Sequence, residues 1–440
     1  MIQNFTSSIH GGFSERKEIV GTYRFLANDR VTESDLIASM IEPTKTKVAN
    51  QRILVLCDTT EYNLQNHKER ITDFHGIGST SKNDILGFFS HNQLVLERES
   101  KQTLGWANVT LFNRPLNNKP FIRPNFSIPI TQKESNKWYE PSLYSRDIVL
   151  KQAEHCLYVM DREADIYEVI DSLPNKKCDF LIRSKHDRIV NFGGERKKLK
   201  SIINQSPAKG IVKLNINGES KKRKKREAKC ELRYEKITIP RPHKIYGKEE
   251  FSKSREITVL QIKEVSQIPL GETRIEWFLS TSEEVTNNKE ACELLDCYSS
   301  RWTIEEVHRL LKTKGFNIES TELESGKSIR KLLLLGMEAS IKVMELKAAR
   351  SGESETKTIE LFENNEIEFL RILNQNLQGS TELLSNPYDK EKLAWASWII
   401  ARLGGWKGYK SQRPPGTITF KRGLDKFYQQ FNGFLLARKL

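Results

Sequence analysis

Short, continuous apolar runs mark the first two thirds of the chain. Two of them, residues 52–57 and 156–160, end directly at an aspartate, Asp58 and Asp161. Runs of this kind are typical of strands buried on both faces of a sheet. Further apolar runs predict strands at 85–89, 93–97, 103–112, 180–182, 211–216, 230–239, 257–262 and 276–280.

Apolar positions at three- and four-residue spacing predict helices between and after these strands. Thr32 opens one such stretch and predicts a capped helix. The other predicted helices cover 165–173, 287–313, 326–350 and most of the last 90 residues, whereas 113–150 is rich in loops. The pattern predicts an α/β protein with a helical N-terminal segment (1–50), a central domain (51–350) and a helical C-terminal domain (351–440). A β-rich insertion at about 190–270 interrupts the central domain.

Charge adds a candidate partner. The 440-residue chain has a net charge of +14, and residues 181–260 alone contain 23 Lys and Arg against 9 Asp and Glu. A localised basic region favours a nucleic acid as partner, although a solvated, charged insertion would have the same composition. No apolar run approaches the roughly 20 residues of a membrane span. Because the N-terminus also has no signal peptide pattern, we expect a cytoplasmic protein. The six cysteines form no CxxC pair and are expected to be reduced.

Asp58 and Asp161 are candidate metal ligands. Each follows an apolar strand, and adjacent strands would bring the two carboxylates together, where a divalent cation relieves their repulsion. Oxygen ligands without a Cys/His set indicate Mg²⁺ or Mn²⁺. Either aspartate taken singly could equally be a turn residue or a helix cap.

A third acid lies in a distinctive helical segment. Tyr298, Arg301, Glu305 and Lys312 follow steps of three, four and seven residues, which keep side chains on one face of a helix. Such a face would present a metal-binding carboxylate beside phosphate-binding groups. The alternative is an exposed helix with an ordinary ion pair between Arg301 and Glu305.

Several motifs in order resemble the IS4 family of transposases, the Tn5-like group. The segment from Tyr298 to Lys312 matches the family signature Y-x2-R-x3-E-x6-K, and Asp161–Asp165 and Asp58-Thr-Thr match its DREAD and DTT stretches. The blocks 183–186, 277–282 and 403–406 are also similar to the family's.

This resemblance implies an RNase H-like catalytic core with a β-rich insertion and a D-D-E triad, here Asp58, Asp161 and Glu305, that holds two Mg²⁺ or Mn²⁺ ions. The implied reaction is cut-and-paste transposition: cleavage at the transposon ends, formation and opening of a hairpin, and strand transfer into target DNA. The implied partners are double-stranded DNA, as inverted-repeat ends and target, and a second copy in a synaptic homodimer contacted by the C-terminal helices.

The resemblance also implies the DNA contacts. We expect phosphate or base contacts from Tyr298, Arg301, Lys312, Arg183, Lys185, Arg188, Trp277 and Trp302. The two tryptophans are candidates for stacking on a flipped base, with core packing as their alternative. The basic run 221–226 is expected to bind duplex backbone.

The chain departs from the family before Gly21, where relatives have a longer helical stretch that recognises transposon ends. An N-terminally truncated, non-catalytic regulator that inhibits transposition is therefore the alternative function. A general RNase H-like nuclease is a third, although it leaves the segment from Tyr298 to Lys312 unexplained.

Overall fold

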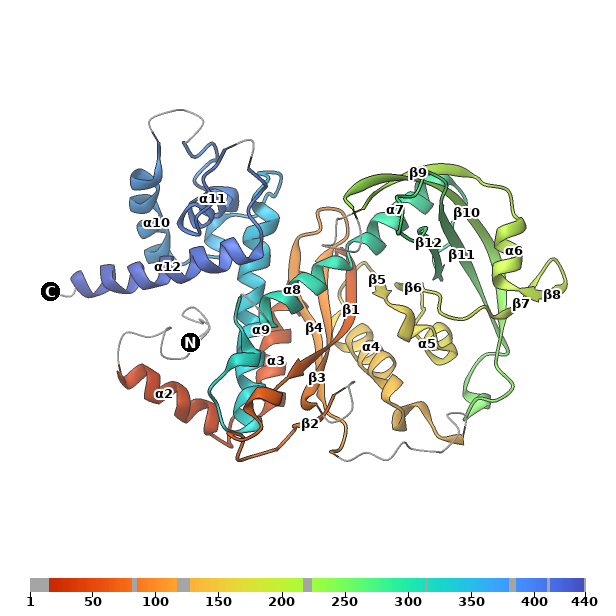
Figure 1. The fold of residues 1–440 in the computed structure, drawn as a ribbon, viewed down its shortest axis with the longest axis horizontal. Coiled ribbons are helices and arrows are strands. Elements are labelled where there is room, and N and C mark those ends of the chain that lie inside the picture. The colour runs from red at the N-terminus through yellow and green to blue at the C-terminus, as the bar shows by residue number, and fades with distance from the viewer. Residues whose placement is uncertain are drawn as a thin grey trace. The chain divides into compact units, whose positions relative to one another are not determined.

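A computed structural model describes residues 16–80, 85–116, 127–216, 224–312, 315–379, 385–409 and 412–438. The fold is mixed α/β (Figure 1), as the sequence predicts. The chain forms two compact units that alternate along the sequence. The first contains Met1–Lys47, Thr59–Lys119 and Thr303–Leu440, and the second contains Val48–Asp58 and Pro120–Trp302.

Three parallel strands begin the sheet of the second unit. β1 (Arg52–Asn63), whose first half belongs to this unit, runs parallel to β5 (His155–Met160), which in turn runs parallel to β6 (Cys178–Arg183). Residues 53–57 and 156–160 are buried. Burial on both faces explains why these segments are continuously apolar instead of alternating.

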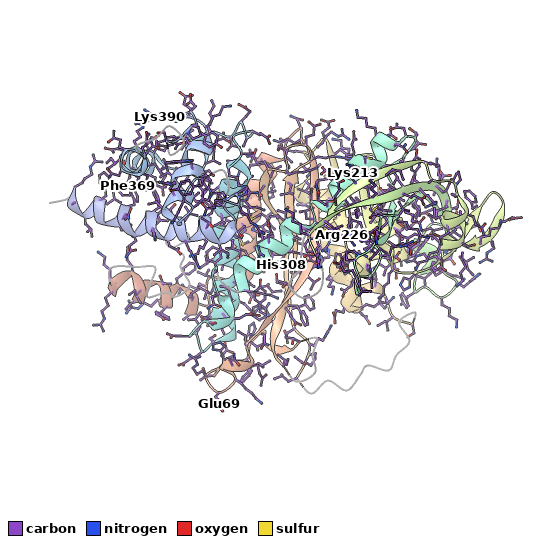
Figure 2. All side chains as sticks on the ribbon, turned by 45° about the horizontal axis from the view of Figure 1, so that its top comes forward. Glu69, Lys213, Arg226, His308, Phe369 and Lys390 are labelled. Atoms are coloured by element: carbon purple, nitrogen blue, oxygen red, sulfur yellow. The ribbon has the colours of Figure 1, made fainter. Side chains whose placement is uncertain are left out.

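The rest of this sheet is antiparallel. β12 (Glu276–Thr281) pairs with β6, β11 (Ser254–Glu264) with β12, and β10 (Arg226–Pro240) with β11. Three shorter strands complete it: β9 (Gly210–Ile216) and β7 (Ile189–Phe192) pair with β10, and β8 (Glu195–Lys198) pairs with β7. In Figure 2, the labels Lys213 and Arg226 mark β9 and the start of β10. The predicted β-rich segment is thus observed, but residues 221–223 of the basic run lie outside the described part of the chain.

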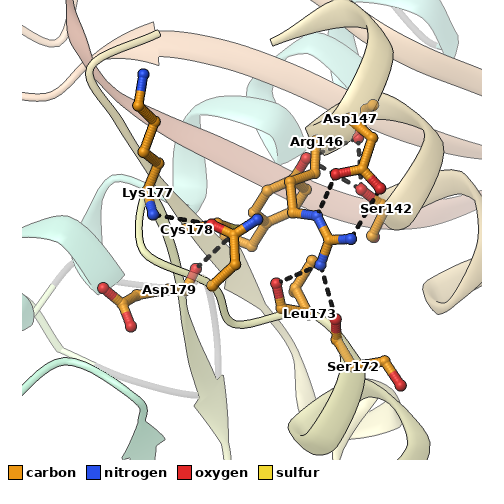
Figure 3. Close-up of polar contacts among 11 residues, drawn as sticks. Ser142, Arg146, Asp147, Ser172, Leu173, Lys177, Cys178 and Asp179 are labelled. Atoms are coloured by element: carbon orange, nitrogen blue, oxygen red, sulfur yellow. Dashed lines mark hydrogen bonds and ion pairs between the residues drawn. The ribbon is translucent and has the colours of Figure 1, made fainter. Parts of the chain in front are cut away.

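The second unit also contains the helices α4 (Glu140–Tyr144), α5 (Tyr167–Ser172), α6 (Leu199–Gln205) and α7 (Asn288–Ser299). Arg146 caps the C-terminal end of α5, as Figure 3 shows. Its Nη1 donates to the carbonyl oxygens of Ser172 and Leu173, both at 2.7 Å, while Asp147 neutralises its charge. The last carbonyls of a helix have no partner within the helix, and Arg146 supplies one.

The first unit is built around α9 (Gly326–Ala349), a helix buried along most of its length. It contacts α2 (Arg16–Ala27), α3 (Glu33–Lys47) and β4 (Thr103–Phe112). Trp106 of β4 is fully buried and donates from Nε1 to the carbonyl oxygen of Met337 at 3.1 Å. β4 pairs with β3 (Leu86–Glu97), and β3 pairs with the short β2 (Gly78–Ser79) and with β1.

The C-terminal part of the first unit is helical, as predicted. It contains α8 (Trp302–Lys312) from Thr303 onward, α10 (Asn364–Leu377), α11 (Leu393–Leu403) and α12 (Thr417–Ala437). Trp395 and Trp398 on α11 are 1% and 6% exposed, so they belong to the core of this unit and are not available for a dimer contact. No helix in the described part of the chain is long and apolar enough to cross a membrane.

Three predicted elements differ in the structure. β1 continues through Asp58 to Asn63, so Asp58 lies within a strand and not just past its end. The two strands predicted at 85–89 and 93–97 are one strand, β3. The single helix predicted at 287–313 is wrong, because α7 ends at Ser299 and α8 begins at Trp302. Two serines precede the break, and their hydroxyls hydrogen-bond to carbonyls four residues back; such bonds bend helices.

Candidate active site

The register of the parallel strands aligns three functional side chains in the second unit. Leu56 of β1 pairs with Val159 of β5, and Val159 pairs with Leu181 of β6. Two positions beyond this row come Asp58, Asp161 and Arg183. Side chains two residues apart lie on the same face of a strand, and neighbouring strands are about 4.8 Å apart. The two carboxylates and the guanidinium therefore lie side by side along these three adjacent strands.

The two aspartates are electrostatically coupled. Burial raises the pKa of Asp161, and the charge of Asp58 raises it further, whereas the Glu163 N–H and Arg301 act in the opposite direction. Arg301 Nη1 lies 3.6 Å from Asp58 Oδ1, and the backbone N–H of Glu163 donates to Asp161 Oδ1 at 2.7 Å. This pair of half-buried carboxylates is the kind of environment that a divalent cation stabilises.

Beside the aspartates, Trp277, Arg183 and Tyr298 form a cluster from three elements. The rings of Trp277 and Tyr298 meet edge to face with centroids 5.9 Å apart, and the Arg183 guanidinium lies 5.7 Å from the Trp277 ring centroid. Burial lowers the pKa of Arg183 and raises that of Tyr298, and each of these two groups opposes the shift of the other. The structure thus brings together three of the predicted DNA-contacting residues.

Asp165, the last residue of the DREAD stretch, anchors the loop after β6. Its carboxylate is 4% exposed and accepts hydrogen bonds from the backbone N–H groups of Lys185 and His186 at 2.7 and 3.0 Å. It also binds Arg188 through Nε at 3.2 Å and Nη2 at 2.8 Å. Arg188, expected to contact DNA, therefore has a structural partner, whereas the Lys185 side chain is exposed. Sequence reasoning missed this anchor, because Asp165 and its partners are about 20 residues apart.

The remaining predicted site residues lie on α8. Glu305 and Lys312 belong to the first unit, where Lys312 Nζ lies 5.5 Å from the ring centroid of Tyr62. Trp302, the first residue of α8, is 60% exposed and belongs to the second unit. Because the helix breaks before Trp302, Tyr298 does not share a continuous helix with Glu305, contrary to the prediction.

A second polar group, which sequence reasoning missed, occupies the opposite ends of the same strands. His155 at the start of β5, Asp179 near the start of β6 and Glu283 after β12 have side-chain atoms close enough to share a metal ion. His155 Nε2 lies 2.9 Å from Asp179 Oδ2, and Ser282 Oγ donates to Asp179 Oδ1 at 2.6 Å. These contacts connect β5, β6 and the segment after β12. No motif spacing could have indicated them, because the residues are widely separated in sequence.

A comparison with protein families finds a match over part of the chain. Residues 144–339 match the model of the transposase DDE domain. The match supports a DDE transposase, an enzyme that acts on DNA and uses divalent metal ions. The matched region runs from α4 into α9, so it includes Asp161, the Arg183 cluster and Glu305, whereas Asp58 precedes it.

Proposed function

We propose that this chain is a cut-and-paste DNA transposase of the IS4 family, with Asp58, Asp161 and Glu305 as its catalytic carboxylates. The observation that carries the proposal is the alignment of Asp58 with Asp161 on adjacent parallel strands, in a chain whose residues 144–339 match the transposase DDE domain. The match and the two paired acids do not favour the alternative of a non-catalytic regulator.

The strand order supports an RNase H-like core. β4 pairs with β3, β3 with β1, β1 with β5 and β5 with β6, and the last two pairings are parallel. This arrangement puts the first carboxylate on the strand in the middle of the five and the second on its parallel neighbour. The resemblance of the sequence to Tn5-like transposases implies the same order of acids along the chain.

The donor set fits divalent metal ions. Asp58 and Asp161 offer hard oxygen ligands, which suit Mg²⁺ or Mn²⁺. The pKa of Asp161 is raised by its burial first and by the negative charge of Asp58 in addition. Arg301 already places one positive charge at Asp58. When bound, two such ions activate the attacking oxygen and stabilise the departing one.

Glu305 is the proposed third ligand. It follows Arg301, the residue that contacts Asp58, by four positions in the chain. Arg301 would then orient Asp58 and hold phosphate, while Tyr298 and Lys312 bind phosphate on either side. Arg183, Lys185, Trp277 and Trp302 are proposed to contact DNA, Trp302 through its exposed ring and Lys185 through its exposed ammonium group. Cleavage of both ends requires a second copy of the chain, as a homodimer.

The test is cleavage of a labelled duplex that carries the terminal repeat of the encoding element. Wild-type protein with Mg²⁺ should nick the end and give a hairpin, and Asp58→Asn, Asp161→Asn and Glu305→Gln should each abolish cutting while retaining DNA binding by fluorescence anisotropy. Glu306→Gln is the matched control, because Glu306 is adjacent on α8 and pairs with Lys347. Full activity in one of the three variants removes that residue from the triad, and no cutting by the wild type refutes the proposal.

A further inference from the structure

β3 has an unusual run of polar residues in its buried interior. Ser90, His91, Asn92 and Gln93 expose none of their surface. Burial of a polar side chain costs free energy unless a hydrogen bond compensates for it. Four such residues in succession in one strand therefore indicate specific partners, and the first unit supplies them for Ser90, His91 and Asn92.

Alternate residues of a strand face opposite sides, and this run makes contacts on both. On one face, His91 Nδ1 lies 2.9 Å from Oγ1 of Thr59, the residue that follows the first catalytic aspartate of the proposal. On the other face, Ser90 Oγ donates to Asn92 Oδ1, and Asn92 Nδ2 lies 2.9 Å from His308 Nε2. The run thus connects β3 with β1 and with α8.

The Ser90 hydroxyl fixes the direction of the second set of contacts. Because it donates to Oδ1 of Asn92, the amide NH₂ group points at His308. An NH₂ group can only donate, so Nε2 of His308 is the acceptor and the ring proton is on Nδ1. The contact therefore requires a hydrogen-bond acceptor at the Nε2 position of residue 308.

His308, labelled in Figure 2, lies one helical turn from Glu305 on α8 and is 6% exposed. The buried face of this helix is otherwise apolar: Ile304, Val307, Leu310 and Leu311. Apolar contacts are non-directional, so they hold the helix against the unit without fixing its rotation. The Asn92 amide is directional, and it acts next to Glu305.

We propose that Asn92 is a positioning residue that fixes the rotation of α8 through His308 and so sets the orientation of Glu305, the proposed third ligand. The proposal rests on the function proposed above, and it adds residues of β3 to the machinery. On the opposite face of the same strand, His91 restrains Thr59 and hence the stretch of β1 that carries Asp58.

A purely structural role makes a different prediction. Replacing both members of a buried polar pair by apolar residues of similar shape is nearly neutral for stability, whereas replacing one leaves an unsatisfied group. A double Asn92→Leu/His308→Leu variant should therefore recover most of the stability lost by either single change. If Asn92 acts by orientation, the double variant should not recover cleavage.

The experiment compares the full-length wild type with His308→Leu, His308→Gln, Asn92→Leu and the double variant, using the metal-dependent cleavage assay, DNA affinity and thermal unfolding. Gln keeps an acceptor near the Nε2 position. We expect His308→Leu and Asn92→Leu to lower the cleavage rate about ten- to a hundredfold, with DNA affinity unchanged. His308→Gln should lose much less. The matched control is Asn108→Leu on β4, because Asn108 pairs with Gln93 and so lies on the face of the sheet opposite to Asn92.

Several outcomes would overturn the inference: single variants that cleave like the wild type, His308→Gln as impaired as His308→Leu, or recovery of cleavage together with stability in the double variant. A wild type that does not cleave overturns the proposed function instead. Amide hydrogen exchange then still decides the structural part, because Asn92→Leu should accelerate exchange in α8 and Asn108→Leu should not.

Discussion

Removal of the Asp165 carboxylate should destabilise the second unit strongly. This side chain is 4% exposed and holds the loop after β6 through two backbone N–H groups and the Arg188 guanidinium. Asp165→Ala would leave those N–H groups without their acceptor and a guanidinium, itself 18% exposed, without its counter-charge.

The size of the effect follows from these contacts. Breaking a buried ion pair by removing one partner costs about 3–5 kcal/mol, because the other charge remains buried. The lost backbone hydrogen bonds act in the same direction, so we expect a loss of about 3–5 kcal/mol for Asp165→Ala. Asp165→Asn keeps an acceptor oxygen and should lose less.

Urea unfolding of the variants, followed by circular dichroism, measures this loss. Asp187→Ala is the matched control: Asp187 lies in the same loop, accepts from the Lys200 N–H at 2.9 Å and is 31% exposed, so its removal should cost below about 1 kcal/mol. A loss for Asp165→Ala as small as that of the control would refute the assignment of Asp165 as the anchor.

Two further predictions concern pH and salt. Burial, reinforced by Glu345, raises the pKa of Glu338 to about 7 from its ordinary 4.5. The folded state therefore binds this proton more tightly than the unfolded chain does. Ionised Glu338 lowers the free energy of unfolding, and this destabilisation is absent below about pH 4 and complete above about pH 7. Glu338→Gln should accordingly leave stability unchanged at pH 4 and raise it by about 2–3 kcal/mol at pH 8; equal gains at both pH values in urea unfolding would contradict this. DNA affinity should fall linearly with salt on logarithmic axes, with a slope of about −0.9 per phosphate contact, and a flat response in anisotropy titrations would argue against the basic segment as a DNA surface.

The α/β fold class and the proximity of Asp58 and Asp161 could be predicted because their signals are local. An apolar run that ends in an acid is visible within six residues, and burial on both faces requires that composition. The catalytic roles of Asp58, Asp161 and Glu305 are still predictions, since their evidence is the motifs. The helix break before Trp302 was not predicted, because apolar periodicity continues through it.

β3 shows why other features could not be predicted. Its interior run from Ser90 to Gln93 is polar, so the pattern indicated two separate strands, 85–89 and 93–97. The run is buried because Thr59 and His308, 32 and 216 residues from their partners, satisfy two of its side chains. The partners of buried Asp165 are also distant in sequence, although by only about 20 residues. A polar residue in a core can be assigned only when its partner is known, and the sequence does not supply the pairing.

Net charge misleads for a related reason. Residues 181–260 account for the whole positive excess, yet several of their arginines have buried acidic partners. Arg226 is 13% exposed and contacts Glu264 and Glu272, which are 0% and 5% exposed, and Arg255 pairs with Asp171. These arginines hold strands and loops in place, so the cations that remain for DNA are fewer than the count suggests. The salt dependence of DNA affinity therefore measures how many cations contact phosphate, which the composition alone does not give. Its slope should reflect exposed groups such as Lys185, and not the paired arginines.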